Sequence, residues 1–453
     1  MPDRGFLQDW GFRADSPAVF DGNNRRWLTR AQLTRHVGEL ADRLQFPRKA
    51  LVFLFAANDV ESLVAYLAAL QAGHAVAMLS PDLDESLAAR LMALFQPDFI
   101  VRKGEPVPGE RRTARTIHPD LSLLISTSGS TGSPKLVRLS WRNLESNARQ
   151  IIAALHHTER DRTMVTAPIF NGYGQSVIHT MLLAGGSFAL TRARIVSREF
   201  WDTARAAECN TSGGTPFFYQ TLDRLDLESL DVPLLTKFVQ IGGRMPPHLA
   251  EKFHAIARAR GGELHLMYGQ AEATARISGL PPELLPEACR SVGFVLHGGQ
   301  LEIENEGREC APLEEGELVY EGPNVMMGYA TCADDLAKGD EMGGRVATGD
   351  LGYRDERGLF YITGRRSRFV KLFGWRVSLD EVEQLLSDSA PVAAVSQGDR
   401  IVIYTERPDA ALAEAVDGLA RKLNLHRSGF EIRAVDAIPR LANSKVNYQL
   451  LTR

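Results

Sequence analysis

The sequence predicts an α/β protein. It has a large N-terminal domain of parallel-sheet α/β layers with a small β subdomain, and a small α+β C-terminal domain. Three observations support this prediction. The chain has 453 residues, which is too long for one compact core and predicts two or three domains. A strand–helix–strand pattern occupies residues 51–79. After about residue 290 the pattern changes to short alternating segments separated by Gly turns.

Residues 51–79 carry the clearest pattern of elements. The apolar run 51–56 predicts a buried strand, and 60–72 predict an amphipathic helix that ends at Gly73, a typical helix stop. Residues 75–79 predict a second strand. A strand, a helix and a strand in such a short stretch indicate a βαβ unit and therefore a parallel sheet.

Further apolar runs predict more strands of this kind, at 121–126, 163–167, 238–241 and 264–267. In open α/β sheets, ligands bind beyond the carboxyl ends of the strands. Several loops of unusual composition follow these runs, so a binding site is expected there.

After about residue 290, short alternating segments at 301–305 and 316–320, separated by Gly turns, predict the β subdomain. From Gly364 the chain becomes basic, and a strand–helix–strand–helix–strand pattern follows. We therefore expect an N-terminal domain of residues 1–365 and a C-terminal domain of residues 366–453.

The formal net charge is −4, and no long basic run occurs. A sequence-independent nucleic-acid binder needs a dense positive surface, so no nucleic-acid partner is expected. The first residues carry charges where a signal peptide needs an apolar run. The strongest early apolar stretch is far shorter than the ~20 residues that span a bilayer. We expect a cytoplasmic protein without a membrane span.

Residues 126–135, which read STSGSTGSPK, directly follow a predicted strand. Small residues let backbone N–H groups approach a polyphosphate, and Lys135 adds a compact positive charge. The spacing is not that of a P-loop, because Pro134 stands where that motif needs its second glycine. The alternative is a flexible turn with an ordinary surface lysine. The candidate phosphate ligands are Thr127, Ser128, Gly129, Ser130, Thr131, Gly132 and Lys135.

With this loop, the sequence resembles the adenylate-forming superfamily of acyl-CoA synthetases, luciferases and peptide-synthetase adenylation domains. It looks most like a bacterial AMP-dependent acyl-CoA synthetase. Further motifs follow in order: 242–246 (GGRMP), 267–274 (MYGQAEAT), 348–350 (TGD), 364–365 (GR) and 439–445 (PRLANSK). The resemblance implies ATP-dependent activation of a carboxylic acid to acyl-AMP with release of pyrophosphate, and then transfer to a thiol.

The resemblance assigns the carboxylate that binds the Mg²⁺ of ATP to Glu272, which agrees with the oxygen ligands that Mg²⁺ prefers. It places Tyr268 beside the adenine and gives Asp350 both ribose hydroxyls, a task for a two-oxygen acceptor. Arg365 would contact ribose or phosphate as a permanent charge. Further nucleotide contacts are expected from Gly243, Arg244, Met245, Gly269, Gln270 and Ile362.

Lys445 matches the final motif of the superfamily, whose lysine joins the carboxylate and the α-phosphate during adenylation. Two positions depart from the pattern: Ala271 replaces a threonine that contacts the α-phosphate, and Ser444 replaces a glycine. The missing hydroxyl either removes a contact worth ~1.5–3 kcal/mol or is offset by Thr274. The expected catalytic residues are Lys135, Glu272 and Lys445.

In this superfamily the small C-terminal domain rotates between the two half-reactions, so the domain of residues 366–453 is expected to be mobile. The hinge is matched by Arg366, Ser367 and Arg368. The loop that turns inward for thiol transfer is matched by Lys371, Gly374 and Trp375. The acceptor is expected to be CoA or the phosphopantetheine of an acyl or peptidyl carrier protein, because the basic rim suits both.

The acid pocket is expected around residues 168–174, which read PIFNGYG. Relatives that activate amino acids place an Asp near here to pair with the substrate ammonium. No acidic residue occurs in this segment, and a buried ammonium without a partner is costly, so a fatty, aryl or other non-amino acid is expected. The pocket candidates are Asn171, Gly172, Tyr173, Gly242 and Gly243.

Three other functions stay open from the sequence. The chain could be an adenylation domain that loads a carrier protein only. It could be a non-catalytic relative that binds nucleotide or an acyl ligand, which Ala271 and Ser444 favour and the retained Lys135, Glu272 and Lys445 argue against. A luciferase-like oxidation leaves no separate mark in the sequence.

Overall fold

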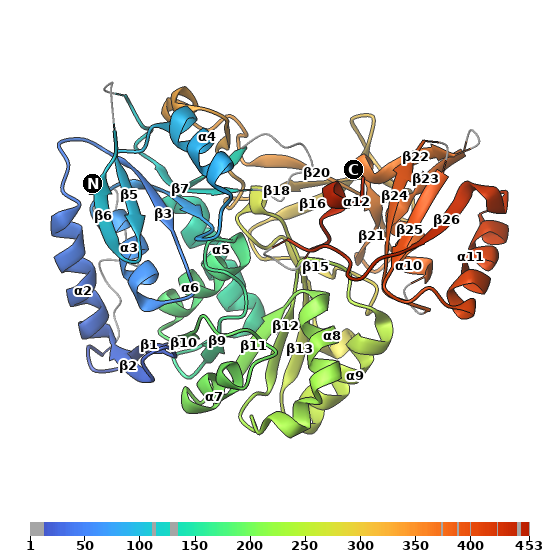
Figure 1. The fold of residues 1–453 in the computed structure, drawn as a ribbon, viewed down its shortest axis with the longest axis horizontal. Helices are drawn as coiled ribbons and strands as arrows, with labels where there is room; N and C mark the ends of the chain where they lie inside the picture. The colour runs from blue at the N-terminus through green and yellow to red at the C-terminus, as the bar shows by residue number, and fades with distance from the viewer. Residues whose placement is uncertain are drawn as a thin grey trace.

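Two large sheets, a five-stranded sheet and a smaller C-terminal part form the described chain (Figure 1). The structure is a computed structural model. It describes residues 13–110, 115–126, 135–372, 375–386, 389–398, 400–423, 425–441 and 445–452. Within these ranges no helix is both long and apolar enough to cross a bilayer.

The first large sheet has the strand order β19-β8-β7-β4-β3-β5-β6. Its central strands β3, β4, β5 and β7 are parallel, whereas β6, β8 and β19 are antiparallel to their neighbours. Every residue of β3 and β4 is buried, as in strands covered on both faces. The strands are β3 (Leu51–Phe55), β4 (Ala75–Leu79), β5 (Phe99–Arg102), β6 (Glu105–Pro108), β7 (Leu121–Ser126), β8 (Leu136–Ser140) and β19 (Gly328–Ala330).

The second large sheet has the order β15-β14-β13-β12-β11-β9-β10-β1-β2 and is parallel from β13 to β1. Strand β9 ends at Met164, earlier than predicted, because the Thr166 hydroxyl bonds the Gly213 carbonyl and the chain then turns at Pro168. The strands are β1 (Pro17–Asp21), β2 (Arg26–Thr29), β9 (Arg162–Met164), β10 (Ser187–Leu190), β11 (Thr211–Gly214), β12 (Lys237–Gln240), β13 (Glu263–Tyr268), β14 (Ser278–Leu280) and β15 (Phe294–Val295).

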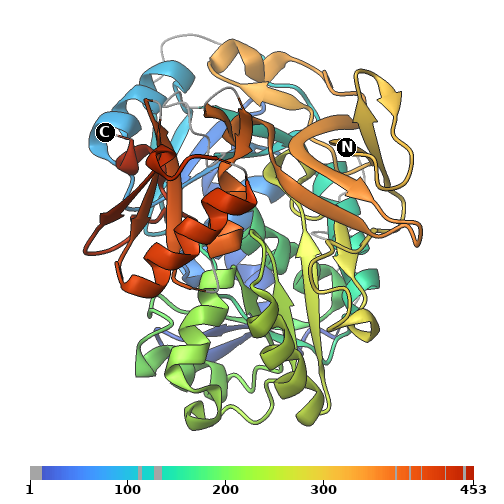
Figure 2. The same cartoon turned by 90° about the vertical axis from the view of Figure 1, so that its right-hand side faces the viewer.

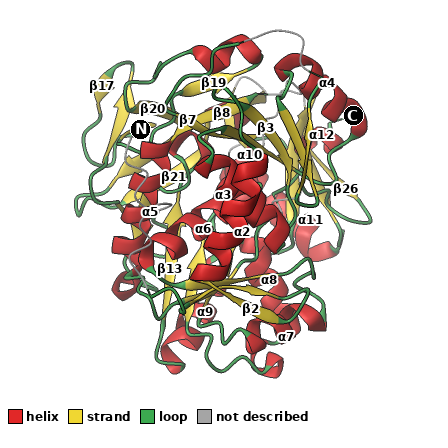
Figure 3. Cartoon of the chain, turned by 90° about the vertical axis from the view of Figure 1, so that its left-hand side faces the viewer, coloured by secondary structure: helices red, strands yellow, loops and turns green. Residues whose placement is uncertain are grey.

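Helices α2, α3, α5 and α6 contribute to the hydrophobic core that lies between the two large sheets (Figure 3). Helix α3 is buried at all but two positions, Glu61 and Gln71. The predicted amphipathic pattern of this helix is therefore wrong, because α3 packs on β3 and β4 and is also covered by the helices α2 and α6. Helices α7, α8 and α9 share a second core with the nine-stranded sheet. The helices are α2 (Arg30–Arg43), α3 (Val60–Gln71), α4 (Glu85–Phe95), α5 (Trp141–Leu155), α6 (Gly172–Ala184), α7 (Arg198–Ala206), α8 (Pro216–Leu225) and α9 (Pro247–Ala259).

The five-stranded antiparallel sheet, in the order β17-β16-β18-β20-β21, is the β subdomain that the sequence predicts. Its long strand β20 carries the TGD motif, and β21 carries Arg365 at its end. The strands are β16 (Gln300–Asn305), β17 (Arg308–Glu309), β18 (Gly316–Glu321), β20 (Arg345–Arg354) and β21 (Phe360–Arg365).

After β21 the chain passes through a short 3-10 helix, η5 (Arg366–Arg368), and builds two small sheets with their own hydrophobic cores (Figure 2). Together with the parallel layers, this arrangement confirms the predicted α/β fold class. The elements are β22 (Phe369–Leu372), β23 (Trp375–Ser378), α10 (Leu379–Leu386), β24 (Val392–Gln397), β25 (Arg400–Thr405), α11 (Ala410–Lys422), β26 (Phe430–Ala434) and α12 (Tyr448–Leu451).

Candidate active site

Asp350 is the centre of a first cluster of site residues. It lies directly opposite Arg365 in the antiparallel pairing of β20 with β21. Arg365 Nε donates to Asp350 Oδ1 at 2.9 Å, and the Tyr268 hydroxyl donates to Oδ2 at 2.6 Å. Burial, together with the Asp350 carboxylate, raises the pKa of Tyr268, so the phenol remains a proton donor. Asp350 is thus an acceptor with two oriented oxygens, the property that ribose binding needs.

Glu272 is the centre of a second cluster. It lies in the 3-10 helix η2 (Ala271–Ala273), which follows β13. The Tyr329 hydroxyl, from β19, donates to Glu272 Oε1 at 2.9 Å, and Lys135 Nζ lies 3.2 Å from the centroid of the Tyr329 ring. Tyr329 therefore links a predicted metal ligand to a predicted phosphate ligand. No sequence pattern indicates Tyr329, because its position depends on the pairing of β19 with β8.

A magnesium ion that accompanies ATP fits the second cluster. Mg²⁺ is commonly bound by one or two carboxylates together with phosphate oxygens and water, and Glu272 offers one carboxylate. No group of three His, Cys, Asp or Glu side chains that could hold a metal by itself occurs in the described ranges. The residues therefore suit an ion that arrives with the nucleotide.

Lys445 reaches the region between these two clusters. Its Cε lies 3.7 Å from the position that a Cβ would occupy on Gly242, so the side chain lies against the glycine loop after β12. Burial lowers the pKa of Lys445, and the Arg365 charge lowers it further. The carboxylates of Asp350 and Glu272 act in the opposite direction. A lysine from the last residues of the chain is thus brought among side chains from β20 and η2.

The segment that carries Lys445 is fixed at both ends. Arg440 forms a β-bridge with Val446, and the N–H of Leu441 donates to the Lys445 carbonyl at 2.8 Å. The Arg440 guanidinium also lies 4.4 Å from the centroid of the Phe217 ring in α8. The C-terminal part therefore packs against the large sheets in an arrangement that places Lys445 in the site.

The other predicted nucleotide contacts lie close by but in different settings. Arg244 donates to the Gln384 side chain in α10 and to the Ile362 carbonyl in β21. Met245 is buried in the core of the nine-stranded sheet. Gly269 has no room for a side chain, because a Cβ there would lie 2.0 Å from the Ala275 carbonyl oxygen. Gly243 lies against the Pro216 ring, and the Gln270 carbonyl accepts the Ala273 N–H.

Several predicted residues lie outside the described residues. They include the phosphate-loop candidates Thr127, Ser128, Gly129, Ser130, Thr131 and Gly132. Ser444 and Gly374, and the side chains of Lys371 and Trp375, also lie outside them. Lys135 is therefore the one member of the predicted phosphate loop whose contacts can be stated.

The predicted hinge is tied to both neighbouring regions. Arg366 donates to Glu317 Oε2 of β18 at 3.1 Å, whereas Arg368 donates to Glu383 Oε1 of α10 at 2.6 Å. The Tyr448 ring centroid lies 3.8 Å from the Arg368 guanidinium carbon. Ser367, between them, is exposed. Arg366 thus contacts the large part of the chain, whereas Arg368 contacts α10 and α12.

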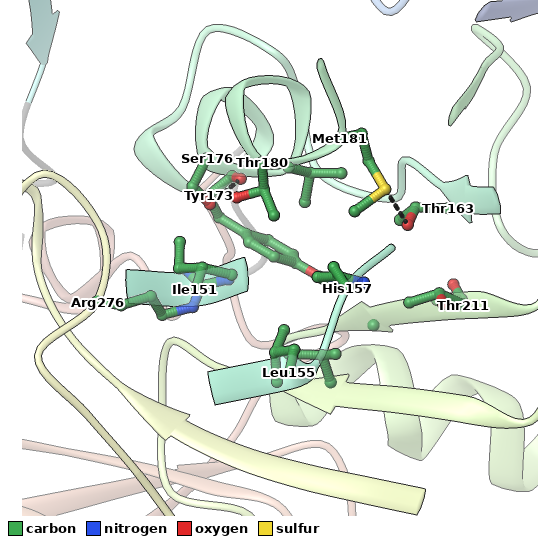
Figure 4. Close-up of a pocket in the computed structure, with 14 residues that line it drawn as sticks. Ile151, Leu155, His157, Thr163, Tyr173, Ser176, Thr180, Met181, Thr211 and Arg276 are labelled. Carbon is green, nitrogen blue, oxygen red and sulfur yellow. Dashed lines mark hydrogen bonds between the residues drawn. The ribbon is translucent and has the colours of Figure 1, made fainter. Parts of the chain in front are cut away.

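A pocket lies between α5, α6, β9, β11 and β12 (Figure 4), and Tyr173 is the one of the five predicted acid-pocket residues that lines it. Tyr173 of α6 lies in its middle, with its hydroxyl 2.9 Å from the position of a Cβ on Gly213. Arg276, which follows η2, lies 4.9 Å from the centroid of the Tyr173 ring. Gly172 lies near the Thr274 carbonyl, and Asn171 precedes α6 as its N-cap residue.

Sequence reasoning missed most of the side chains that line this pocket. Tyr173 was predicted, but Arg276 was not, because it lies two positions beyond the recognised motif 267–274. His157, Thr180 and Ser212 come from three separate elements that only the fold brings together. These lining residues are Ile151, Leu155, His157, Thr163, Tyr173, Ser176, Val177, Thr180, Met181, Thr211, Ser212, Gly213, Val239 and Arg276.

Thr274 does not offset the missing hydroxyl at Ala271. Its hydroxyl is buried and donates to the Asn324 carbonyl at 2.7 Å, which holds it in the backbone framework. The positive φ of 62° at Thr274 turns the chain away from η2. Of the two alternatives that the sequence left open, the structure therefore supports a missing contact.

The site thus combines the carboxylates of Asp350 and Glu272 with a lysine from the C-terminal part, Lys445. The AMP-binding enzyme family matches residues 8–116 and 103–330, and the chain belongs to this family. This confirms the resemblance to the adenylate-forming superfamily and the predicted class of enzyme. A 2-succinylbenzoate–CoA ligase of Bacillus velezensis is 30% identical over 340 residues, which are 72% of this chain and 67% of the relative. A medium-chain fatty-acid–CoA ligase of Escherichia coli is 28% identical over 75% of this chain and 62% of the relative.

Solved structures share the fold over nearly the whole length. The o-succinylbenzoate CoA synthetase of Bacillus subtilis, in complex with its acyl-adenylate intermediate, has a TM-score of 0.82 at 22% identity and covers 100% of this chain and 98% of its own. ATP-bound MatB of Rhodopseudomonas palustris has a TM-score of 0.81 at 22% identity, covering 99% and 97%. At this identity the likeness concerns the fold.

Proposed function

We propose that this enzyme activates a carboxylic acid with ATP to acyl-AMP and pyrophosphate, and then transfers the acyl group to the thiol of CoA. The observation that carries the proposal is the position of Lys445. This residue comes from the C-terminal part, lies against Gly242, and is close enough to Asp350 and Glu272 for their carboxylates to raise its pKa. Because these residues come from distant parts of the chain, their meeting is not expected by chance. The names of the relatives, which are CoA ligases, support CoA as the acceptor.

In the first half-reaction, a carboxylate oxygen of the acid forms a bond to the α-phosphorus of ATP, and pyrophosphate leaves. Both reactants are anions, so their approach is opposed by charge repulsion. Lys445 and Lys135 offset that repulsion, and preorganised charge of this kind is usually the largest catalytic contribution. Magnesium, held by Glu272 with the phosphates, supplies further positive charge. Tyr268 and Asp350 orient the nucleoside so that the two reacting atoms meet in line.

In the second half-reaction, the thiol sulfur attacks the acyl carbon and AMP leaves. We propose that residues 366–453 act as a mobile domain and that Arg366, Ser367 and Arg368 are its hinge. The arrangement described above, with Lys445 inside the site, corresponds to acid activation. Rotation would have to break the ion pair of Arg366 with Glu317, or that of Arg368 with Glu383, which gives the hinge two alternative anchors. Lys371, Gly374 and Trp375 are proposed for the thiol side.

The acid is proposed to be a non-amino acid, because the segment 168–174 has no acidic residue for an ammonium group. The relatives differ in their acids, which include 2-succinylbenzoate, medium-chain fatty acids, sulfoacetate and oxalate. A carrier protein that bears phosphopantetheine is the second candidate acceptor, supported by the basic residues from 365 to 376.

The proposal is tested by the exchange of labelled pyrophosphate into ATP over a panel of acids, followed by mass analysis with CoA or with a phosphopantetheinyl carrier. Acid-dependent exchange and an acyl-CoA product are expected. If the folded protein binds ATP but exchanges pyrophosphate with no acid, the non-catalytic alternative is correct. Light emission or oxygen uptake would instead support a luciferase-like oxidation.

A further inference from the structure

Arg276 presents a buried and unpaired positive charge to the acid pocket. The residue is 2% exposed. Its backbone is held firmly, because its carbonyl accepts hydrogen bonds from the side-chain amides of Asn147 at 3.0 Å and Asn324 at 2.9 Å. Among the described residues, no group forms a hydrogen bond with its Nε or Nη1 and no carboxylate forms an ion pair with it. The guanidinium contacts the face of Tyr173 instead.

Besides His157 Nδ1, which lies 3.4 Å from Asp161 Oδ1, two hydroxyl groups of the same pocket lack a partner among the described residues. The hydroxyl oxygens of Thr180 and Ser212 are buried and form no hydrogen bond with described residues. Figure 4 shows Thr180 above the ring of Tyr173 and Arg276 below it. The pocket has about 20 Å³ of free space for water-sized groups, which is room for one small polar group.

This set of atoms calls for an anion rather than an apolar chain. A buried guanidinium without a partner destabilises a protein, and a carboxylate or sulfonate matches its planar fork of donors. The two hydroxyls add donors for the same oxygens. A water molecule could accept hydrogen bonds from these donors but would not neutralise the charge of Arg276. A hydrocarbon tail would neither accept the hydrogen bonds nor neutralise the charge.

We propose that the acid substrate carries a second anionic group, a carboxylate or a sulfonate, which enters this pocket and pairs with Arg276. The inference rests on the proposed function, because it concerns the acid that this site activates. Val239 lines the pocket, and Gly242, against which Lys445 lies, follows it by three positions in the chain. The pocket therefore lies next to the loop that Lys445 approaches, so the acid is proposed to direct one anion to Lys445 and the other to Arg276.

The test compares a homologous series of dicarboxylates with the monocarboxylates and the half-amides of the same length in pyrophosphate exchange. The dicarboxylate of best length is expected to exceed its monocarboxylate in kcat/KM by about 10- to 100-fold, the size of one charged hydrogen bond. The half-amide separates a need for charge from a need for any acceptor, and it is expected to behave like the monocarboxylate. A sulfonate analogue is expected to behave like the dicarboxylate.

Arg276→Met removes the charge but keeps an unbranched side chain. It is expected to abolish the preference, so that the kcat/KM for the dicarboxylate falls to that for the monocarboxylate of the same length. Arg198→Met is the matched control. It removes the same charge from the surface of α7, where the Arg198 side chain is 91% exposed. This control is expected to keep the full preference.

Three outcomes would overturn the inference: equal kcat/KM for the dicarboxylate and the monocarboxylate, an advantage of the half-amide, or an unchanged preference in Arg276→Met. Thermal melting with the dicarboxylates provides a second measurement that does not depend on turnover. The dianion is expected to raise the Tm of the wild-type protein but not of Arg276→Met. If no acid supports exchange, the proposed function fails, and an equal Tm shift in both proteins would then reject the anion site as well.

Discussion

Arg138 and Arg276 are both buried, and their two regions of the molecule differ in how they satisfy the charge. In the seam where β19 pairs with β8, Arg138 donates to the carbonyls of Tyr329 at 3.2 Å and Met327 at 3.0 Å, and it pairs with Glu341. In the acid pocket, Arg276 is equally buried but its Nε and Nη1 have no partner. Burial lowers the pKa of both groups, and that of Arg276 to about 10, so both remain charged at neutral pH.

The difference separates a structural charge from a charge that is kept for a ligand. Arg138 holds the Tyr329 backbone, and the side chain of Tyr329 in turn contacts Glu272 and Lys135. The nucleotide side of the site is therefore organised before any ligand binds. On the acid side the fold leaves donors unpaired, which lowers stability and leaves the interaction available to a substrate.

The largest expected effect is the loss of the paired arginine. Arg138→Met removes the hydrogen bonds to the Tyr329 and Met327 carbonyls and the pairing with Glu341. The free energy of unfolding is expected to fall by about 3–5 kcal/mol, because several hydrogen bonds from one charged group, each worth ~1.5–3 kcal/mol, are lost together. Urea unfolding followed by circular dichroism measures this, with Arg198→Met as the surface control. A fall below about 1 kcal/mol would show that the seam does not depend on Arg138.

Lys445 is a partly buried cation of the nucleotide side, and its removal tests whether positive charge there serves catalysis. Lys445→Ala is expected to lower pyrophosphate exchange by about 100- to 1,000-fold, the effect of losing one preorganised donor in an active site. Thioester formation from a preformed acyl-adenylate and CoA should remain. An equal loss in both half-reactions would reject the proposed role of Lys445 in adenylation alone.

Arg276→Met makes the opposite prediction for stability. Replacement of an unpaired buried charge by an apolar side chain is expected to raise the free energy of unfolding by about 1–3 kcal/mol, even though selectivity for the acid is lost. The same urea series measures it beside Arg138→Met. If Arg276→Met destabilises the protein as much as Arg138→Met does, Arg276 is a structural residue and the contrast between the two regions is wrong.

The smallest effect is expected at Tyr329, which connects the seam to the nucleotide side. Tyr329→Phe keeps the ring under Lys135 but removes the hydrogen bond to Glu272. A loss of about 1 kcal/mol is expected, seen as a roughly 5-fold rise in the KM for ATP with little change for the acid. Titration of exchange against ATP and against acid measures both constants. A change confined to the KM for the acid would show that Tyr329 contributes to binding of the acid and not of ATP.

Much of the fold could be predicted because local patterns follow burial. The strands β3, β4, β7, β16 and β18 were found within one residue at either end, since apolar runs with turn residues at both ends have few alternatives. The surface pattern of helix α3 was predicted wrongly, because no local signal shows that a helix is covered by a sheet on one side and by other helices on the other. The motif residues Tyr268, Asp350 and Arg365 were also recognised, and the structure brings these three together.

The sequence by itself determined the family, the order of the elements and the residue types of the nucleotide motifs, because these features are local in the chain. Only the tertiary structure decided which residues complete the site. Tyr329 meets Glu272 across 57 positions, and Arg276 meets Tyr173 across 103 positions, through sheet pairing and helix packing. The pairing of a buried charge depends on every neighbour in space, so the distinction between Arg138 and Arg276 could come only from the fold.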